Sequence, residues 1–305
     1  MMGLSTYYSL TGNKEQDLNW VIKYYNKRNQ WPLVQQLWAS WAYASSFESP
    51  KEGIKYLMQL QQIDDQDTNV YYMLGLTYNK IDQYDKAIPE LRKCYEIYRK
   101  YGTEFLKDHF VYVQLGKAYH RTGQYKKEKK VYKESEKLDP DFLYIIFRQI
   151  ILALSENDSI TAKRYIGKYK SISKKNSSSE AAISTDLAYI YSEAGNQDKA
   201  EEFYRKALSL EPENPAYIKQ FADFIINNNR NVTEIPELMD KAIKLAPNKH
   251  DYYDYLNTKG WGLYKQGKYK EALEILQETW DEAPFKLYSF RSHLEEVKKM
   301  VASQK

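Results

Sequence analysis

Two stretches of the chain align with each other: YMLGLTYNKIDQYDKAIPELRKCYEIY (72–98) and YVQLGKAYHRTGQYKKEKKVYKESEKLDP (112–140). Both contain a Leu-Gly pair, a Tyr three residues after the glycine, and another Tyr six residues later. The same scheme returns, with some substitutions, at 185–214 and at 260–284. Because the scheme recurs along the chain, it predicts a repeat architecture in which each unit packs on its neighbours.

The residue types at the recurring positions are those that pairs of packed helices require. Small residues let two helix backbones approach closely, and a glycine in the left-handed conformation ends a helix at little cost. A proline after the second helix cannot continue its hydrogen-bond ladder. The small residues are Gly75, Gly116, Ala188 and Gly260 in the first helices and Ala87, Ala200 and Ala272 in the second; the turn glycines are Gly123, Gly195 and Gly267; the prolines are Pro140, Pro212, Pro247 and Pro284.

These residues resemble the tetratricopeptide repeat, a motif of about 34 residues with the pattern W-x₂-L-G-x₂-Y…A-x₃-F…P. The resemblance covers nearly the whole chain and implies an all-α fold, a right-handed superhelical α–α solenoid of helical hairpins. We expect about seven hairpins over residues 1–284, the first truncated and those at 141–180 and 215–248 degenerate. Residues 285–305 are expected to form a C-terminal capping helix and a tail.

The weaker copies depart from the motif at identifiable places. Residues 34–67 form one copy, since Gly53 lies 34 positions before Ala87, but Trp41 stands where a small residue is expected. The copy at 215–248 carries an Asn-rich insertion, NNNRN, before its second helix.

The two ends of the array differ. Tyr8 and Gly12 occupy motif positions of the truncated first copy, whose second helix is expected from Glu15 to Asn29. The segment LYSFRSHLEEVKKMVA (287–302) is amphipathic, and a terminal repeat needs such a cover for its apolar face. No comparable cap precedes the first repeat, so the N-terminal end is where we expect self-association.

Composition and charge fit a helical repeat protein better than a nucleic-acid-binding or membrane protein. The net charge is +4, and residues 101–175 hold 16 Lys and Arg against 9 Asp and Glu. We interpret this segment as a solvated helix face, because a nucleic-acid-binding domain usually has a pI above about 9 and the pI here is about 8.6. No apolar run approaches the roughly 20 residues of a membrane-spanning helix.

The sequence shows no recognisable catalytic or metal-binding arrangement. The four histidines are spread singly, and no phosphate-binding glycine loop or nucleophile elbow is present. The one cysteine, Cys94, occupies a small core position and excludes an internal disulfide. We therefore expect neither an enzyme nor a cofactor or metal site.

The resemblance implies that the first helix of each hairpin lines a concave wall that holds the partner. Carried over by motif position, the wall residues are Trp38, Tyr72, Asn79, Lys80, Lys117, His120, Arg121, Tyr189, Asn257, Trp261 and Tyr264. Aromatic and Arg side chains often dominate the energy of protein interfaces. Three of the residues, Lys117, His120 and Arg121, are expected to form a basic spot. The alternative is that several of the aromatic rings pack between adjacent helices.

The expected function is a non-catalytic scaffold that binds a peptide or partner protein along this wall. The alternative is a sensory or regulatory module of a larger protein that binds a small ligand or a signalling peptide. The members of the family that bind chaperones grip a C-terminal carboxylate with Lys and Asn at two wall positions. No repeat here has that pair, so such a co-chaperone role is disfavoured.

Overall fold

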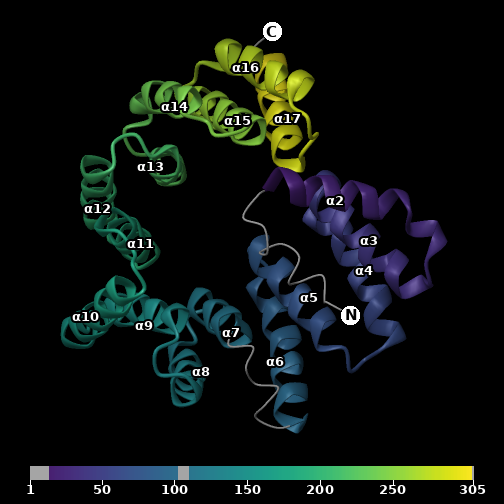
Figure 1. Ribbon diagram of the computed structural model, residues 1–305, viewed down its shortest axis with the longest axis vertical. Coiled ribbons are helices and arrows are strands. Elements are labelled where there is room, and N and C mark those ends of the chain that lie inside the picture. The colour runs from purple at the N-terminus through teal and green to yellow at the C-terminus, as the bar shows by residue number, and fades with distance from the viewer. Residues whose placement is uncertain (1–13, 102–109, 304–305) are drawn as a thin grey trace. The chain divides into compact units, whose positions relative to one another are not determined.

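The computed structural model describes residues 14–101 and 110–303, and the regular structure of these residues is entirely helical (Figure 1). The predicted all-α architecture of helical hairpins is confirmed. The motif residues Tyr8 and Gly12 lie outside the described part of the chain. No helix of the described residues is long and apolar enough to cross a membrane.

The contacts group the chain into two compact units, residues 1–173 and 174–305. The first unit contains α2 (Lys14–Asn26), α3 (Leu33–Tyr43), α4 (Pro50–Ile63), α5 (Thr68–Lys80), α6 (Tyr84–Tyr101), α7 (Phe110–Arg121), α8 (Tyr125–Leu138) and α9 (Leu143–Ser155), and α10 (Ser159–Lys175) ends at the boundary. The second contains α11 (Glu180–Glu193), α12 (Gln197–Leu210), α13 (Pro215–Asn227), α14 (Ile235–Lys244), α15 (Lys249–Lys265), α16 (Tyr269–Glu282) and α17 (Tyr288–Ser303). The boundary between the two units falls within the last turn of α10. The array over residues 1–284 with a cap at 285–305 stays a prediction.

Consecutive helices pack as hairpins in the pairs α3–α4, α5–α6, α7–α8, α11–α12, α13–α14 and α15–α16. The motif glycines explain how closely the two helices of a hairpin approach. A Cβ atom on Gly116 of α7 would lie 2.0 Å from Cε1 of Tyr132 in α8. A Cβ atom on Gly75 would lie 2.3 Å from Cγ of Leu91. Because real Cβ atoms do not approach other atoms so closely, these positions require glycine. The predicted role of the small residues is confirmed for these two glycines.

Within the described residues, six hairpin turns have the same backbone conformation and hydrogen bond. Each contains a residue with positive φ, and the next N–H donates to the carbonyl five residues earlier, as from Gln124 to Tyr119 at 2.8 Å and from Asp158 to Ala153 at 2.8 Å. This is the Schellman closure of a helix. The residues with positive φ are Asp82, Gly123, Asn157, Gly195, Asn229 and Gly267. The sequence identified only the glycines; Asp and Asn fill the same place because they tolerate the left-handed region.

The first complete hairpin, α3–α4, is built differently. Its first helix continues into a π-helical segment, Ala44–Glu48, and Ser49 then caps α4 by accepting a hydrogen bond from the Glu52 N–H at 3.1 Å. Trp41 is buried, and a Cβ atom on Gly53 would lie 3.3 Å from its Cδ1 atom. The same Cβ atom would lie 2.4 Å from Oγ of Ser45 in the π-helical segment, so the glycine of α4 makes room first for Ser45 and then for the ring of Trp41.

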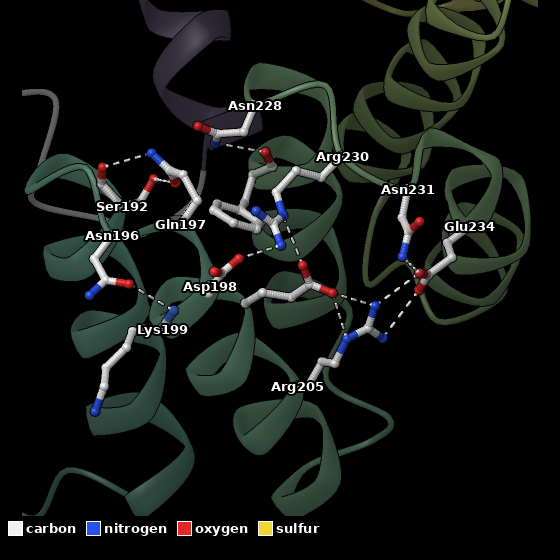
Figure 2. A network of polar contacts seen from close by, with 12 residues as sticks. Ser192, Asn196, Gln197, Asp198, Lys199, Arg205, Asn228, Arg230, Asn231 and Glu234 are labelled. Carbon is white, nitrogen blue, oxygen red and sulfur yellow. Dashed lines mark hydrogen bonds and ion pairs between the residues drawn. The ribbon is translucent and has the colours of Figure 1, made fainter.

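An ion-pair network holds the Asn-rich insertion between α13 and α14 (Figure 2). Arg230 of the insertion donates to Glu201 at 2.9 Å and to Asp198 at 2.8 Å, both on α12. Arg205 of α12 donates to Glu201 at 2.8 Å and to Glu234 at 2.9 Å. Burial would raise the pKa of Glu201, but the hydrogen bonds from the two arginines outweigh it and lower that pKa. The irregular segment is thus fixed to the preceding hairpin.

Candidate partner-binding site

In the second unit, α11, α13 and α15 lie along the inner side of the row of hairpins, and α12, α14 and α16 lie along its outer side (Figure 1). The inner helices are the first helices of their hairpins, as the repeat pattern predicts. Polar and aromatic side chains from α13, α15 and α17 contact one another. We call them the inner cluster: Lys219, Asp223, Asp254, Asn257, Trp261, Tyr264, Lys265 and His293.

The ionic part of the inner cluster joins α13 to α15. The Lys219 ammonium lies 2.7 Å from Asp223 Oδ2 and 3.7 Å from Asp254 Oδ2, and its side chain is 19% exposed. Burial alone would lower the pKa of Lys219, but Asp254 and Asp223 outweigh it and raise that pKa. Burial raises the pKa of Asp223, and Lys219 offsets this only in part. Lys219 is therefore charged at neutral pH and lies between two carboxylates.

The aromatic part of the inner cluster joins α15 to α17. The Trp261 ring stacks on the His293 ring at 4.2 Å with an interplanar angle of 5°, and on the Tyr264 ring at 4.5 Å and 13°. The Lys265 ammonium lies 5.1 Å from the centre of the Trp261 ring, within cation–π range. The rings form an ordered, half-buried apolar surface beside a cation.

The histidine of the cluster is neutral at physiological pH. Burial, with smaller contributions from Lys219 and Lys265, lowers the pKa of His293 from 6.5 to about 4, although Asp254 acts in the opposite direction. Its Nδ1 atom lies 3.2 Å from Oδ1 of Asn257. A neutral ring stacks on tryptophan without the cost of burying a charge.

Of the wall residues predicted in the second unit, the structure brings Asn257, Trp261 and Tyr264 together. Tyr189, on α11, is 41% exposed. Asn257 is only 4% exposed, whereas an open wall position was expected. The Asn257 side chain is buried because it faces His293 of α17 rather than solvent.

The wall residues predicted in the first unit are dispersed. Trp38 is half-buried and meets Trp41 edge-to-face at 5.4 Å, and Tyr72 is half-buried against the core. Lys80 is exposed at the end of α5. Asn79 is 3% exposed instead of open, and it donates to the Gln114 carbonyl at 3.0 Å. It therefore links α5 to α7, and this part of the expectation is wrong.

In the predicted basic spot, His120 contacts a carboxylate of its own hairpin. His120 is turned into its own hairpin, where its Nδ1 lies 3.0 Å from a carboxylate oxygen of Glu128. Glu128 is 1% exposed, and burial raises its pKa while His120 opposes the shift. Lys117 is half-buried and Arg121 is exposed. The prediction failed for His120 because the repeat motif does not show which residue of the second helix faces this position.

Sequence reasoning missed His293 and Asp254 as members of the cluster. A signal for His293 existed, because it lies 36 positions after Asn257, close to one repeat length. Treating the terminal helix as a further first helix would have placed it on the inner side. Among the described residues, no three His, Cys, Asp or Glu side chains gather as a metal site would require.

Stacked two-helix hairpins with a polar, aromatic inner side define an α-helical repeat protein. Family models of the tetratricopeptide repeat match residues 66–141 and 181–214. These two parts of the chain are tetratricopeptide repeats. No curated protein sequence matches it.

Solved structures of similar fold include the Cut9–Hcn1 hetero-tetramer of the APC/C, with 17% identity and a TM-score of 0.50, covering 86% of this chain and 46% of that one. A tetratricopeptide repeat protein from Parabacteroides merdae has 12% identity and a TM-score of 0.43, covering 90% of this chain and 99% of that one. Yeast Tom70 has 16% identity and a TM-score of 0.46, covering 82% and 50%. At these identities the likeness concerns the fold alone.

Proposed function

We propose that the chain is a non-catalytic scaffold that binds a segment of a partner protein along the inner side of its first helices. The observation that carries the proposal is the inner cluster, where side chains of α13, α15 and α17 converge. Stacked rings offer a flat apolar surface, and Lys219, Asp223 and Lys265 supply fixed charges for orientation. Interfaces commonly combine aromatic anchors with a few placed polar groups.

The inner cluster is not simply the hydrophobic core of its hairpin. The core between α15 and α16 consists of fully buried side chains such as Leu263, Ala272 and Leu276, whereas Trp261 and Tyr264 lie half-buried at its margin. Large rings that remain partly accessible at the margin of a core can bury further area against a partner. This distribution supports a binding role for the rings beyond their contribution to stability.

The proposal is tested by affinity capture with the full chain, followed by titration of the recovered partner. Trp261→Ala is expected to weaken binding about 30-fold, since truncating an aromatic anchor costs about 2 kcal/mol. The matched control is Trp280→Ala on the outer helix α16, which is expected to leave the affinity unchanged. Both variants are first checked for helical content. Equal affinities of wild type and Trp261→Ala, or equal losses in both variants, would contradict the proposal.

A further inference from the structure

The helices α8 and α10 of the first unit, each the second helix of its hairpin, carry an unusual distribution of charge. The segment α8 contains six Lys and three Glu, and α10 contains six Lys and Arg with no acidic residue. Lysines mixed with glutamates on one helix face are an ordinary solvated surface, and the sequence alone suggested that interpretation. The structure shows that the two charges are separated instead.

The three glutamates of α8 are directed to partners on neighbouring helices. Glu128 is buried against His120 of α7, and Glu134 accepts a hydrogen bond from the hydroxyl of Tyr95 on α6. Glu136 accepts from Gln149 of α9 at 3.1 Å and from Tyr165 of α10 at 3.2 Å. These carboxylates therefore do not lie among the exposed lysines of α8.

The lysines of α8 form one exposed stripe. Lys126, Lys130, Lys133 and Lys137 follow the i, i+4, i+7, i+11 spacing of a single helix face, over about 16 Å at 1.5 Å per residue. All four are exposed, and among the described residues none of them has a carboxylate partner. The stripe is a continuous row of solvated cations.

The neighbouring helix α10 extends this surface. Tyr165 and Lys168 of α10 bond to Glu136 and to the Pro140 carbonyl at the end of α8, so the two helices lie next to each other. Lys163 and Arg164 of α10 are exposed. Ile160, one turn before them on the same face, is 83% exposed.

We propose that this basic face binds the surface of an anionic lipid bilayer. We define the basic face as Lys126, Lys130, Lys133, Lys137, Ile160, Lys163 and Arg164. Clusters of four to eight basic residues on amphipathic helices are attracted to anionic lipids. Each basic residue raises the affinity for the bilayer about fivefold. Lys129 and Lys168 are excluded because they pair with Glu156 at 2.7 Å and with Asp141 at 3.4 Å.

The side-chain types favour a bilayer over other anionic partners. Lysine is depleted at protein–protein interfaces, and it supplies most of the positive charge here. Binding of single-stranded nucleic acid combines basic residues with aromatic rings on which bases stack, and none of the aromatic rings of α8 and α10 is exposed. An exposed Ile beside Lys and Arg matches the apolar contact of an interfacial helix.

The test is co-sedimentation of the full chain with vesicles of phosphatidylcholine, with or without phosphatidylserine. Binding is expected only to the anionic vesicles, and it should weaken steeply as salt is added. The variant K126Q/K130Q/K133Q should bind about 100-fold more weakly, at about fivefold per residue. The control K241Q/K270Q/K298Q loses the same charge from exposed positions of the second unit and should bind as wild type does.

Ile160→Ser separates a bilayer from a soluble polyanion. It should weaken binding to anionic vesicles but leave binding to polyglutamate or an oligonucleotide unchanged, because only the bilayer has an apolar layer below its headgroups. Absence of vesicle binding by the wild type, equal losses in the two triple variants, or tighter binding to either soluble polyanion would overturn the proposal. Trp261→Ala should retain vesicle binding, which keeps this result distinct from the inner-cluster test.

Discussion

Single residues of the inner cluster make stability depend on pH. The folded pKa of His293 is about 4, below its ordinary value of 6.5, so the unfolded chain takes up a proton that the folded chain excludes. The free energy of unfolding keeps the contribution of His293 in full above pH 6.5. It loses this contribution as the pH falls from 6.5 to about 4, because the unfolded chain then binds a proton on His293. At 1.36 kcal/mol per pKa unit, the loss reaches about 3 kcal/mol at the acidic end.

This dependence is measured by comparing wild type with His293→Gln, which keeps a polar group near Asn257 but does not titrate between pH 7 and pH 4. Urea unfolding at the two pH values gives the change in unfolding free energy for each protein. We expect the wild type to lose about 3 kcal/mol more than the variant. Carboxylates that titrate in the same range act on both proteins and cancel in the difference. Equal losses of unfolding free energy in wild type and His293→Gln between the two pH values would contradict the burial of a neutral imidazole.

At the scale of the element, glycine has opposite effects in turns and in helices. Gly123 sits in a hairpin turn with φ of +70°, and Gly167 lies within α10; a Cβ atom on either meets no atom within 4 Å. Gly123→Ala should destabilise the protein by about 1 kcal/mol, because alanine is strained in the left-handed region. Gly167→Ala should stabilise it by about 0.5–1 kcal/mol through helix propensity.

Thermal or urea unfolding of the two variants beside wild type measures this pair. The two substitutions add the same methyl group in the same unit, so each serves as the control for the other. No loss of stability in Gly123→Ala would show that the turn does not depend on the left-handed residue. A loss in Gly167→Ala would contradict the expected gain from helix propensity.

At the scale of the whole molecule, each unit contains a core cluster of its own. One core cluster of the first unit is built around Leu91, Cys94 and Tyr112, and one of the second around Leu263, Leu276 and Val297. In repeat proteins stability is a sum of local and nearest-neighbour terms, so damage remains local. Truncating a fully buried leucine to alanine costs about 2–5 kcal/mol.

Leu91→Ala and Leu276→Ala are therefore expected to act on different units. Amide hydrogen exchange followed along the chain should show lost protection mainly within residues 14–173 for the first variant and within 174–303 for the second. Uniform loss of protection along both units in either variant would indicate that the chain unfolds as one cooperative body.

Much of the fold could be predicted from the sequence, because the residues of the repeat motif are those that form the contacts inside one hairpin. Gly75, Gly116 and Ala87 mark the approach of two helices that are neighbours in sequence. The motif says less about contacts between hairpins, and this explains the failures in the site. Asn79 bonds to Gln114, and Asn257 faces His293, each about one repeat further along the chain. Likewise, the separation of charge on α8 depends on partners contributed by four other helices.

The stack of His293 on Trp261 also provides an optical signal. The second unit contains two tryptophans, Trp261 and Trp280, and an imidazole in face-to-face contact is positioned to alter the emission of only one of them. Undocking of α17 would remove this contact, and protonation of His293 would strengthen quenching within it. In a Trp280→Phe background, the change in emission on undocking of α17 would therefore come from Trp261, above the constant emission of the four tryptophans of the first unit, and no added dye would be needed.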